Sequence, residues 1–163
     1  MERKGQAAME YLMTYGWAIL IVIIVAAALY ALGVFNPATW TGSRATGFAN
    51  IGAPASGAWK LDASAGSNQM VVVLKNNLPS RIQIDPTQVS VRVGSTDCID
   101  PGVKGNQSAA QTVGIGENFN ITANCGTQSS GSAFTANVEI TYDNLDTGIT
   151  GLKESGTITG TVS

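Results

Sequence analysis

The chain has 163 residues, of which 44% are apolar and only 12% are charged. A formal net charge of −2, from nine Lys and Arg against eleven Asp and Glu, excludes a nucleic-acid binder held by a basic patch. With no histidine and two cysteines, the sequence also excludes His-dependent triads, His-ligated metals and four-cysteine zinc sites. We therefore expect no enzymatic activity, no cofactor, no metal and no nucleic-acid partner.

The first residues form a short charged leader. Arg3 and Lys4 precede a long apolar run, and Glu10 is the only charge between that leader and Arg44. A carboxylate at the start of a membrane helix is costly unless it is paired or lies near the interface. Two interpretations follow: Glu10 forms an ion pair, which we favour, or it lies at the cytoplasmic interface and supports the helix N-terminus.

An uncharged run of 25 residues extends from Tyr11 to Phe35. At 1.5 Å per residue a helix of this length measures roughly 37 Å, enough to cross a bilayer core of about 30 Å. Asn36 and Pro37 end it, because proline lacks the amide proton and disfavours helix in the residue before it. The run is longer than the apolar region of a secretory signal peptide, and the basic leader predicts a cytoplasmic N-terminus.

Aliphatic side chains supply most of the bulk of this helix. They are Ile19, Leu20, Ile21, Val22, Ile23, Ile24, Val25 and Leu29. Small residues among them would let neighbouring helices approach closely. Gly16 either bends the helix or permits such a contact, and the pattern alone leaves both open.

The remainder of the chain changes character and is rich in Gly, Ser, Thr and Asn. Short runs with period-two alternation are separated by turn residues, which is typical of an antiparallel sandwich. The fold class we expect is therefore α+β: a long hydrophobic N-terminal helix followed by an antiparallel β-sandwich head of Ig-like or Greek-key type. Strands are predicted at 70–74, 81–84, 89–93, 119–123, 134–142 and 156–162, and loops at 38–58, 101–110 and 126–133.

Alternation also predicts the core of this head. The candidates are Phe48, Trp59, Leu61, Val71, Val73, Ile82, Ile84, Val89, Val91, Val93, Ile121, Phe134, Val138, Ile140 and Tyr142.

Two further features agree with the basic leader in placing this domain outside the cytoplasm. Cys98 and Cys125 are the only cysteines and can form one disulfide, worth about 3–4 kcal/mol in the chain-entropy model. Asn106 and Asn120 each begin an N-x-S/T tripeptide and are glycosylation candidates. The acidic stretches 97–100 and 143–146 could bind Ca²⁺ or share a proton, but capping of their own turns is the stronger interpretation.

The N-terminal pattern resembles the class III signal peptide of archaeal type IV pilins. Two basic residues, then Gly5 and Gln6, then Glu10 as the fifth residue counted from Gln6, and an unbroken apolar helix carry this resemblance. It implies cleavage between Gly5 and Gln6 by a prepilin peptidase in the cytoplasmic membrane. The implied parts are a signal peptide over 1–5, a filament-core helix over 6–36, a linker over 37–45 and an extracellular head over 46–163.

Cleavage would place the new α-amine of Gln6 one helical turn from Glu10, on the same face. Glu10 could pair with its own amine or with that of a neighbouring subunit and so set the axial register. The resemblance implies a homo-oligomeric surface filament for adhesion, built by an assembly platform from subunits that first reside in the membrane. The alternatives are an archaellin, a minor pilin-like protein, and a monomeric membrane-anchored extracellular binding domain.

Overall fold

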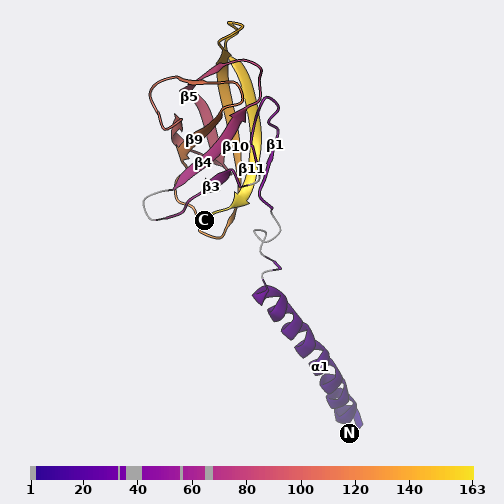
Figure 1. The fold of residues 1–163 in the computed structure, drawn as a ribbon. Coiled ribbons are helices and arrows are strands. Elements are labelled where there is room, and N and C mark those ends of the chain that lie inside the picture. Colours follow the sequence, from indigo (N-terminus) through magenta and orange to yellow (C-terminus); the bar gives the residue numbers. More distant parts are fainter. Residues whose placement is uncertain (1–2, 33, 36–41, 56, 65–67) are drawn as a thin grey trace. The chain divides into compact units, whose positions relative to one another are not determined.

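The computed structural model of the chain describes residues 3–32, 34–35, 42–55, 57–64 and 68–163. They fall into two compact units, Met1–Thr39 with the single helix and Trp40–Ser163 with all the described strands (Figure 1). The chain is thus an α+β protein, with a helix followed by antiparallel sheets. The predicted linker 37–45 lies mostly outside the described residues.

Helix α1 spans Arg3–Ala31 and runs without interruption through Gly16. It begins within the predicted signal peptide, and its last residue is Ala31. At its end the Leu32 amide donates to the Ala28 carbonyl at 2.9 Å, in the helical pattern. The Val34 amide donates to the Leu29 carbonyl at 3.1 Å, a bond between residues five apart that departs from this pattern.

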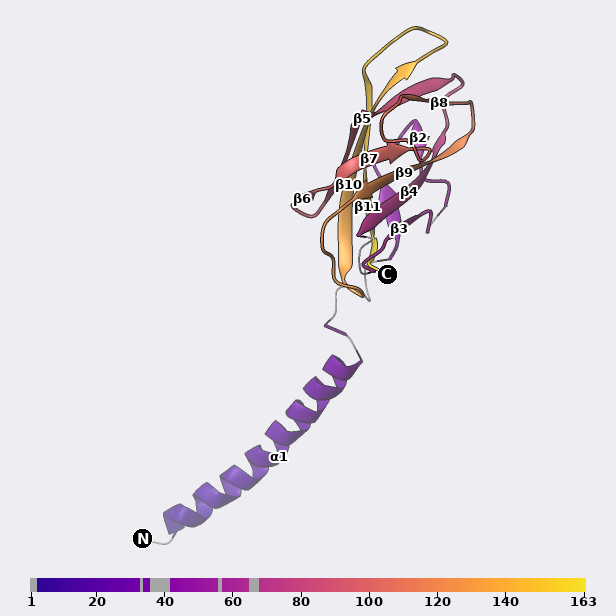
Figure 2. The ribbon, with the colours of Figure 1, turned by 90° about the vertical axis from the view of Figure 1, so that its left-hand side faces the viewer.

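One antiparallel sheet, sheet A, contains six strands in the order β1-β11-β10-β5-β6, with β8 also paired to β5 (Figure 2). Its long members are β5 (Ile82–Val93), β10 (Ala133–Asn144) and β11 (Leu152–Thr161). Its short members are β1 (Arg44–Thr46), β6 (Thr96–Asp97) and β8 (Gln111–Val113).

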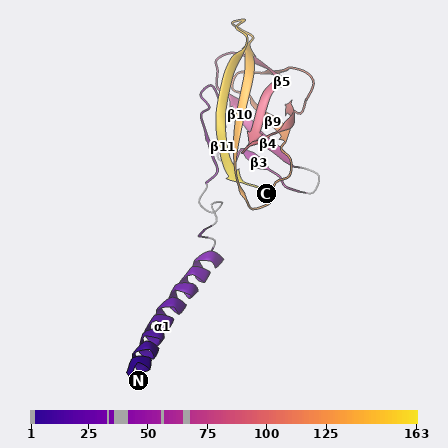
Figure 3. The same ribbon diagram turned by 180° about the vertical axis from the view of Figure 1, so that it is seen from behind.

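The second antiparallel sheet, sheet B, has the order β2-β4-β9-β7, with β3 also paired to β4. Its strands are β2 (Ile51–Gly52), β3 (Trp59–Leu61), β4 (Gln69–Asn76), β7 (Ile99–Val103) and β9 (Asn118–Asn124). Strands β4 and β9 lie in front of β10 and β11 in Figure 1, and the view from behind in Figure 3 shows the reverse. Buried side chains of both sheets form one core cluster between them.

The core confirms the alternation in most strands and corrects it in β4. Val71 and Val73 are only half-buried, whereas Met70, Val72 and Leu74 are fully buried. Five consecutive apolar residues show no alternation that would distinguish the inward from the outward face. Pairing with β3 and β9 therefore decides which side chains are buried. The prediction missed the buried residues Ile51, Val103, Val113, Phe119, Ala123, Ala136, Ile158 and Val162.

Two of the predicted loops contain strands. The segment 38–58 includes β1 and β2, and β7 extends into 101–110. These strands are two to five residues long and lie at the margins of the sheets, where pairing with a longer neighbour supplies the hydrogen bonds. Such strands carry too few alternating residues to be recognised by periodicity.

The predicted disulfide is confirmed. Cys98 and Cys125 are bonded, and no free cysteine is present. Cys98 immediately precedes β7 and Cys125 immediately follows β9, its partner strand. The bond therefore closes the end of this strand pair, and the Cys125 side chain is completely buried.

The segment 47–50, which we call the strap, is held against β11. Phe48 is half-buried rather than part of the closed core, and its ring covers Gly156. Glu154 is 5% exposed, and its carboxylate accepts bonds from the Ala49 amide and from the amide and side chain of Asn50, the last two at 3.3 and 3.2 Å. A buried carboxylate is stable here because it is bonded by backbone and amide donors.

We expect Gly156→Ala to destabilise the head by about 1–3 kcal/mol through overpacking. A Cβ at this position would lie 2.3–2.5 Å from three ring carbons of Phe48, so the strap would have to move. Thermal and denaturant unfolding measure the change. Gly42→Ala is the matched control, since a Cβ there meets nothing within 4 Å; equal stability of the two variants would contradict the packing role of Phe48.

Candidate assembly site

Helix α1 carries the residues predicted for processing and assembly. Glu10 is exposed, and its carboxylate has no bonding partner among the side chains that the structure describes. The Thr14 hydroxyl donates to the Glu10 backbone carbonyl at 3.0 Å. The Gly5–Gln6 peptide bond lies inside α1, while the side chains of residues 3–8 are outside the described set.

Among the described side chains of α1, most of the aliphatic ones are exposed. Side chains from Ile19 to Val25 expose between 48% (Leu20) and 66% (Val22) of their area, and Leu29 is half-buried. The segment Met9–Ala31 has a mean hydropathy of 2.4 and is the one described helix long and apolar enough to cross a membrane. A helix without a polar face gains about 1.5–3 kcal/mol for each large aliphatic side chain removed from water.

Gly16 leaves a hollow on this apolar surface. A Cβ at Gly16 would meet no atom within 4 Å, and Met13, Trp17 and Leu20 line the space around it. Because α1 continues through Gly16, the structure favours close approach of another helix over a bend at this residue.

A second hollow lies beside Glu10. Thr14 and the stacked rings of Tyr11 and Tyr15, with centroids 4.6 Å apart, line it together with Glu10. The carboxylate therefore borders a surface that a side chain of another molecule can enter.

The acidic stretches of the head act as turn caps and ion-pair partners. Asp97 accepts a bond from Arg92 Nε at 2.6 Å, and Asp143 accepts one from the Gly151 amide at 2.8 Å. Asp146 accepts bonds from Arg81 Nε and Nη2 at 3.0 and 2.7 Å and from the Arg81 amide at 2.7 Å. Turn capping is therefore seen in 143–146, where Asp143 and Asn144 accept amides of their own turn, but not in 97–100, where Asp97 forms an ion pair. Within the described ranges no three His, Cys, Asp or Glu gather as a metal site.

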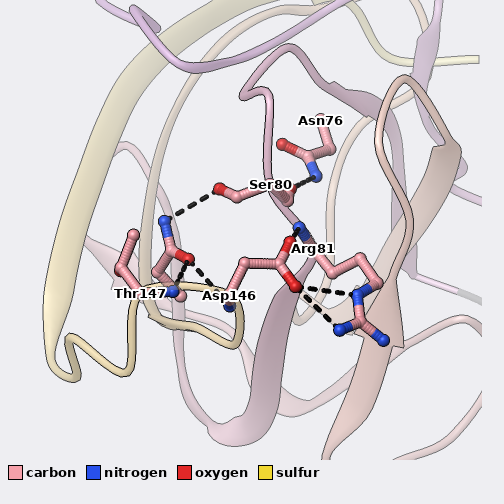
Figure 4. Close-up of polar contacts among 6 residues, drawn as sticks. Asn76, Ser80, Arg81, Asp146 and Thr147 are labelled. Atoms are coloured by element: carbon pink, nitrogen blue, oxygen red, sulfur yellow. Dashed lines mark hydrogen bonds and ion pairs between the residues drawn. The ribbon is translucent and has the colours of Figure 1, made fainter.

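The Asp146–Arg81 contact belongs to a polar network that joins the turns around Ser80 and Asp146 (Figure 4). Buried Asn76 donates to the carbonyls of Ser80 and Gly114 at 2.9 and 3.0 Å. Asn144 donates to the Ser80 hydroxyl at 2.8 Å and accepts from the amides of Asp146 and Thr147. The sequence signalled each turn separately, but their meeting at one end of the head was missed, because it depends on strand pairing.

The two glycosylation candidates lie in different environments. Asn106 is in the turn after β7, where its side-chain oxygen accepts bonds from the amides of Ser108 and Ala109, both at 2.9 Å. Both asparagines are half-buried, but Asn120 lies within β9, which is paired on both sides, with β4 and with β7. Only Asn106 lies in a turn, the usual setting of an accessible acceptor.

Comparison of the chain with protein-family models, curated proteins and solved structures finds no match. The case for function therefore depends on the residues and geometry of this chain.

The Asp146–Arg81 contact predicts a pH dependence of stability. Hydrogen bonds from the Arg81 side chain and then from its amide lower the pKa of Asp146 below its ordinary value. A carboxyl with a lowered folded-state pKa stabilises the fold above its unfolded pKa of about 3.9, and this contribution is lost as the pH falls through the folded value.

We expect Asp146→Asn to unfold more readily than wild type at neutral pH, with the difference shrinking below about pH 4. Unfolding curves across pH measure it. Asp100→Asn removes an exposed carboxylate without an ion pair and is the control; a pH-independent effect of Asp146→Asn would contradict the role of its charge.

We expect glycan at Asn106 and none at Asn120 in protein from the native cells. The reason is the backbone setting, because Asn106 lies in a turn whereas the backbone of β9 at Asn120 is paired with β4 and β7. Mass spectrometry of glycopeptides from the wild type and from Asn106→Gln decides it, and a modified Asn120 would show the expectation to be wrong.

Proposed function

We propose that this protein is the major structural subunit of an archaeal type IV-like pilus, a surface filament used for adhesion, and not an enzyme. The observation that carries the proposal is helix α1: apolar on all sides, uncovered, and with Glu10 as its only charge from Met9 to Ala31. Such a surface requires either lipid or other helices around it. In the proposed subunit, lipid covers the helix before assembly, and the helices of other copies cover it afterwards.

The position of Glu10 favours assembly over simple anchoring. A plain anchor has to be apolar and has no use for a carboxylate one turn inside its start. After cleavage between Gly5 and Gln6, the free amine and Glu10 would be separated by four residues, the spacing at which side groups meet on a helix. A pair of this kind in an apolar bundle gives register, because any slip leaves a buried charge unpaired.

The partners follow from this route. A prepilin peptidase cleaves the precursor in the cytoplasmic membrane, where its N-terminus faces inward, and an assembly platform adds the mature subunit to a filament of identical copies. The head then lies outside the cell, where a disulfide can persist and the sequon in the turn after β7 can be glycosylated. As part of the proposal, the two sheets of the head form a sandwich of Ig-like or Greek-key type.

A monomeric membrane-anchored binding domain is the second candidate. The length and mean hydropathy of Met9–Ala31 favour it equally, since they suit a permanent span as well as a temporary one. The two candidates differ in processing: a permanent anchor keeps residues 2–5, whereas a pilin loses them.

The intact mass of the protein in a sheared, high-molecular-weight surface fraction tests the proposal. We expect a chain that begins at Gln6, with or without the loss of ammonia that accompanies cyclisation of an N-terminal glutamine. A chain that keeps residues 2–5 and remains in the membrane fraction would replace the filament proposal with the anchored domain.

Glu10→Ala tests the register role separately. We expect normal cleavage and about a tenfold or greater loss of filaments, because the amine of Gln6 would be left unpaired in an apolar bundle. Counting filaments and measuring the processed subunit in the membrane distinguishes assembly from processing. Tyr30→Phe, an exposed position of α1 outside both hollows, is the control; normal filaments from Glu10→Ala would remove the register role.

A further inference from the structure

The outward face of sheet A contains a polar hollow of about 460 Å³, which we call the sheet A groove. Ser90 and Arg92 from β5, Asn137 and Glu139 from β10, and Ser155 and Thr157 from β11 line it. Gly47 of the strap lies at its margin. Its volume falls within the range of small-molecule sites, about 300–1,000 Å³.

Strand register arranges these six side chains as a grid. Arg92, Asn137 and Thr157 are directly opposite one another, and so are Ser90, Glu139 and Ser155 in the next outward row. Neighbouring strands are about 4.8 Å apart, and alternate residues along a strand about 6.8 Å apart. The grid therefore covers an area that suits a single sugar ring.

Several hydrogen-bonding groups of the grid are already committed. Thr157 Oγ1 donates to Asn137 Oδ1 at 2.9 Å. Arg92 Nε donates to Asp97 at 2.6 Å, and Lys153 Nζ donates to Glu139 Oε1 at 2.8 Å. These bonds fix the three longer side chains in place.

The groups that remain have no protein partner among the described residues. They are the Asn137 amide nitrogen, the terminal nitrogens of Arg92, the second carboxylate oxygen of Glu139 and the hydroxyls of Ser90 and Ser155. Donors and acceptors thus alternate across a few ångströms. Vicinal hydroxyls of a sugar, each both a donor and an acceptor, match such an array.

Charge and polarity exclude other classes of ligand. Arg92 and Glu139 are each neutralised by an ion pair, so the groove has no net charge to attract an anion or a cation. Among the described residues of the lining, Val138 is the only one with an apolar side chain, and it is buried, so an apolar ligand gains little. We propose that the sheet A groove binds a neutral sugar residue of a glycan.

This proposal does not depend on filament assembly, because all its residues belong to one head. The test uses the full chain, produced in a host without N-glycosylation, in micelles of a zwitterionic detergent that contains no sugar. Saturation-transfer difference NMR is recorded with the methyl glycosides of mannose, glucose and galactose and with N-acetylglucosamine. We expect transfer to at least one of them, with a dissociation constant of about 1 mM, as suits a few hydrogen bonds.

Variants locate the site. We expect Asn137→Ala and Glu139→Gln each to weaken binding about tenfold, since each removes one or more bonds to the sugar. Thr135→Ala is the matched control, on the same strand and face but one row outside the grid, and should leave binding within about twofold. All three positions are exposed, so an unchanged unfolding curve shows that the fold is intact.

Failure of all four probes to receive saturation transfer would overturn the proposal, as would equal effects of Thr135→Ala and Asn137→Ala. The sugar could come from an external polysaccharide or from the glycan of a second copy. Binding that appears in protein from native cells only after Asn106→Gln supports the second source. Equal binding with and without that substitution supports the first.

Discussion

An apolar helix with no polar face is stable only where lipid or other protein covers it. The rest of the structure depends on this requirement. The described side chains of α1 from Met9 onward lie uncovered within their own unit. Each large aliphatic side chain among them contributes about 1.5–3 kcal/mol when it is covered. Lipid and a bundle of like helices satisfy this requirement about equally well, so transfer between them costs little and either state is strongly favoured over exposure to water.

The hydrophobic term therefore cannot choose between membrane and filament. In the proposed filament that choice is made by Glu10, the only charge from Met9 to Ala31, and by the hollows beside it and around Gly16. A carboxylate in an apolar setting makes one arrangement of neighbours far better than the rest, because every other arrangement leaves it without a partner. In the proposed filament, contacts between aliphatic side chains hold the subunits together, and the charge of Glu10 fixes their axial positions.

The head has a hydrophobic core of its own. Both sheets contribute to a single core, the disulfide closes the end of β7 and β9, and the strap fastens the start of the unit onto β11 through Phe48 and Glu154. The strap also connects stability with the proposed sugar site. Gly47 borders the sheet A groove, and Phe48 lies against Gly156, which is part of the floor of that groove.

The sequence by itself determined what depends on neighbours along the chain. The length of the apolar run, the place of Glu10, the β character of the outer segment and the only possible disulfide could all be read from it, because composition and short-range periodicity carry that information. Tertiary structure decided what depends on pairing between distant strands. In β4 it buries Met70, Val72 and Leu74 instead of Val71 and Val73. Strands β1, β2 and β7 form partly or wholly in segments predicted as loops. Ser90, Asn137 and Ser155, from three different strands, lie together in one groove. A one-residue change of register moves every side chain of a strand to the opposite face, so no local pattern could have fixed these positions.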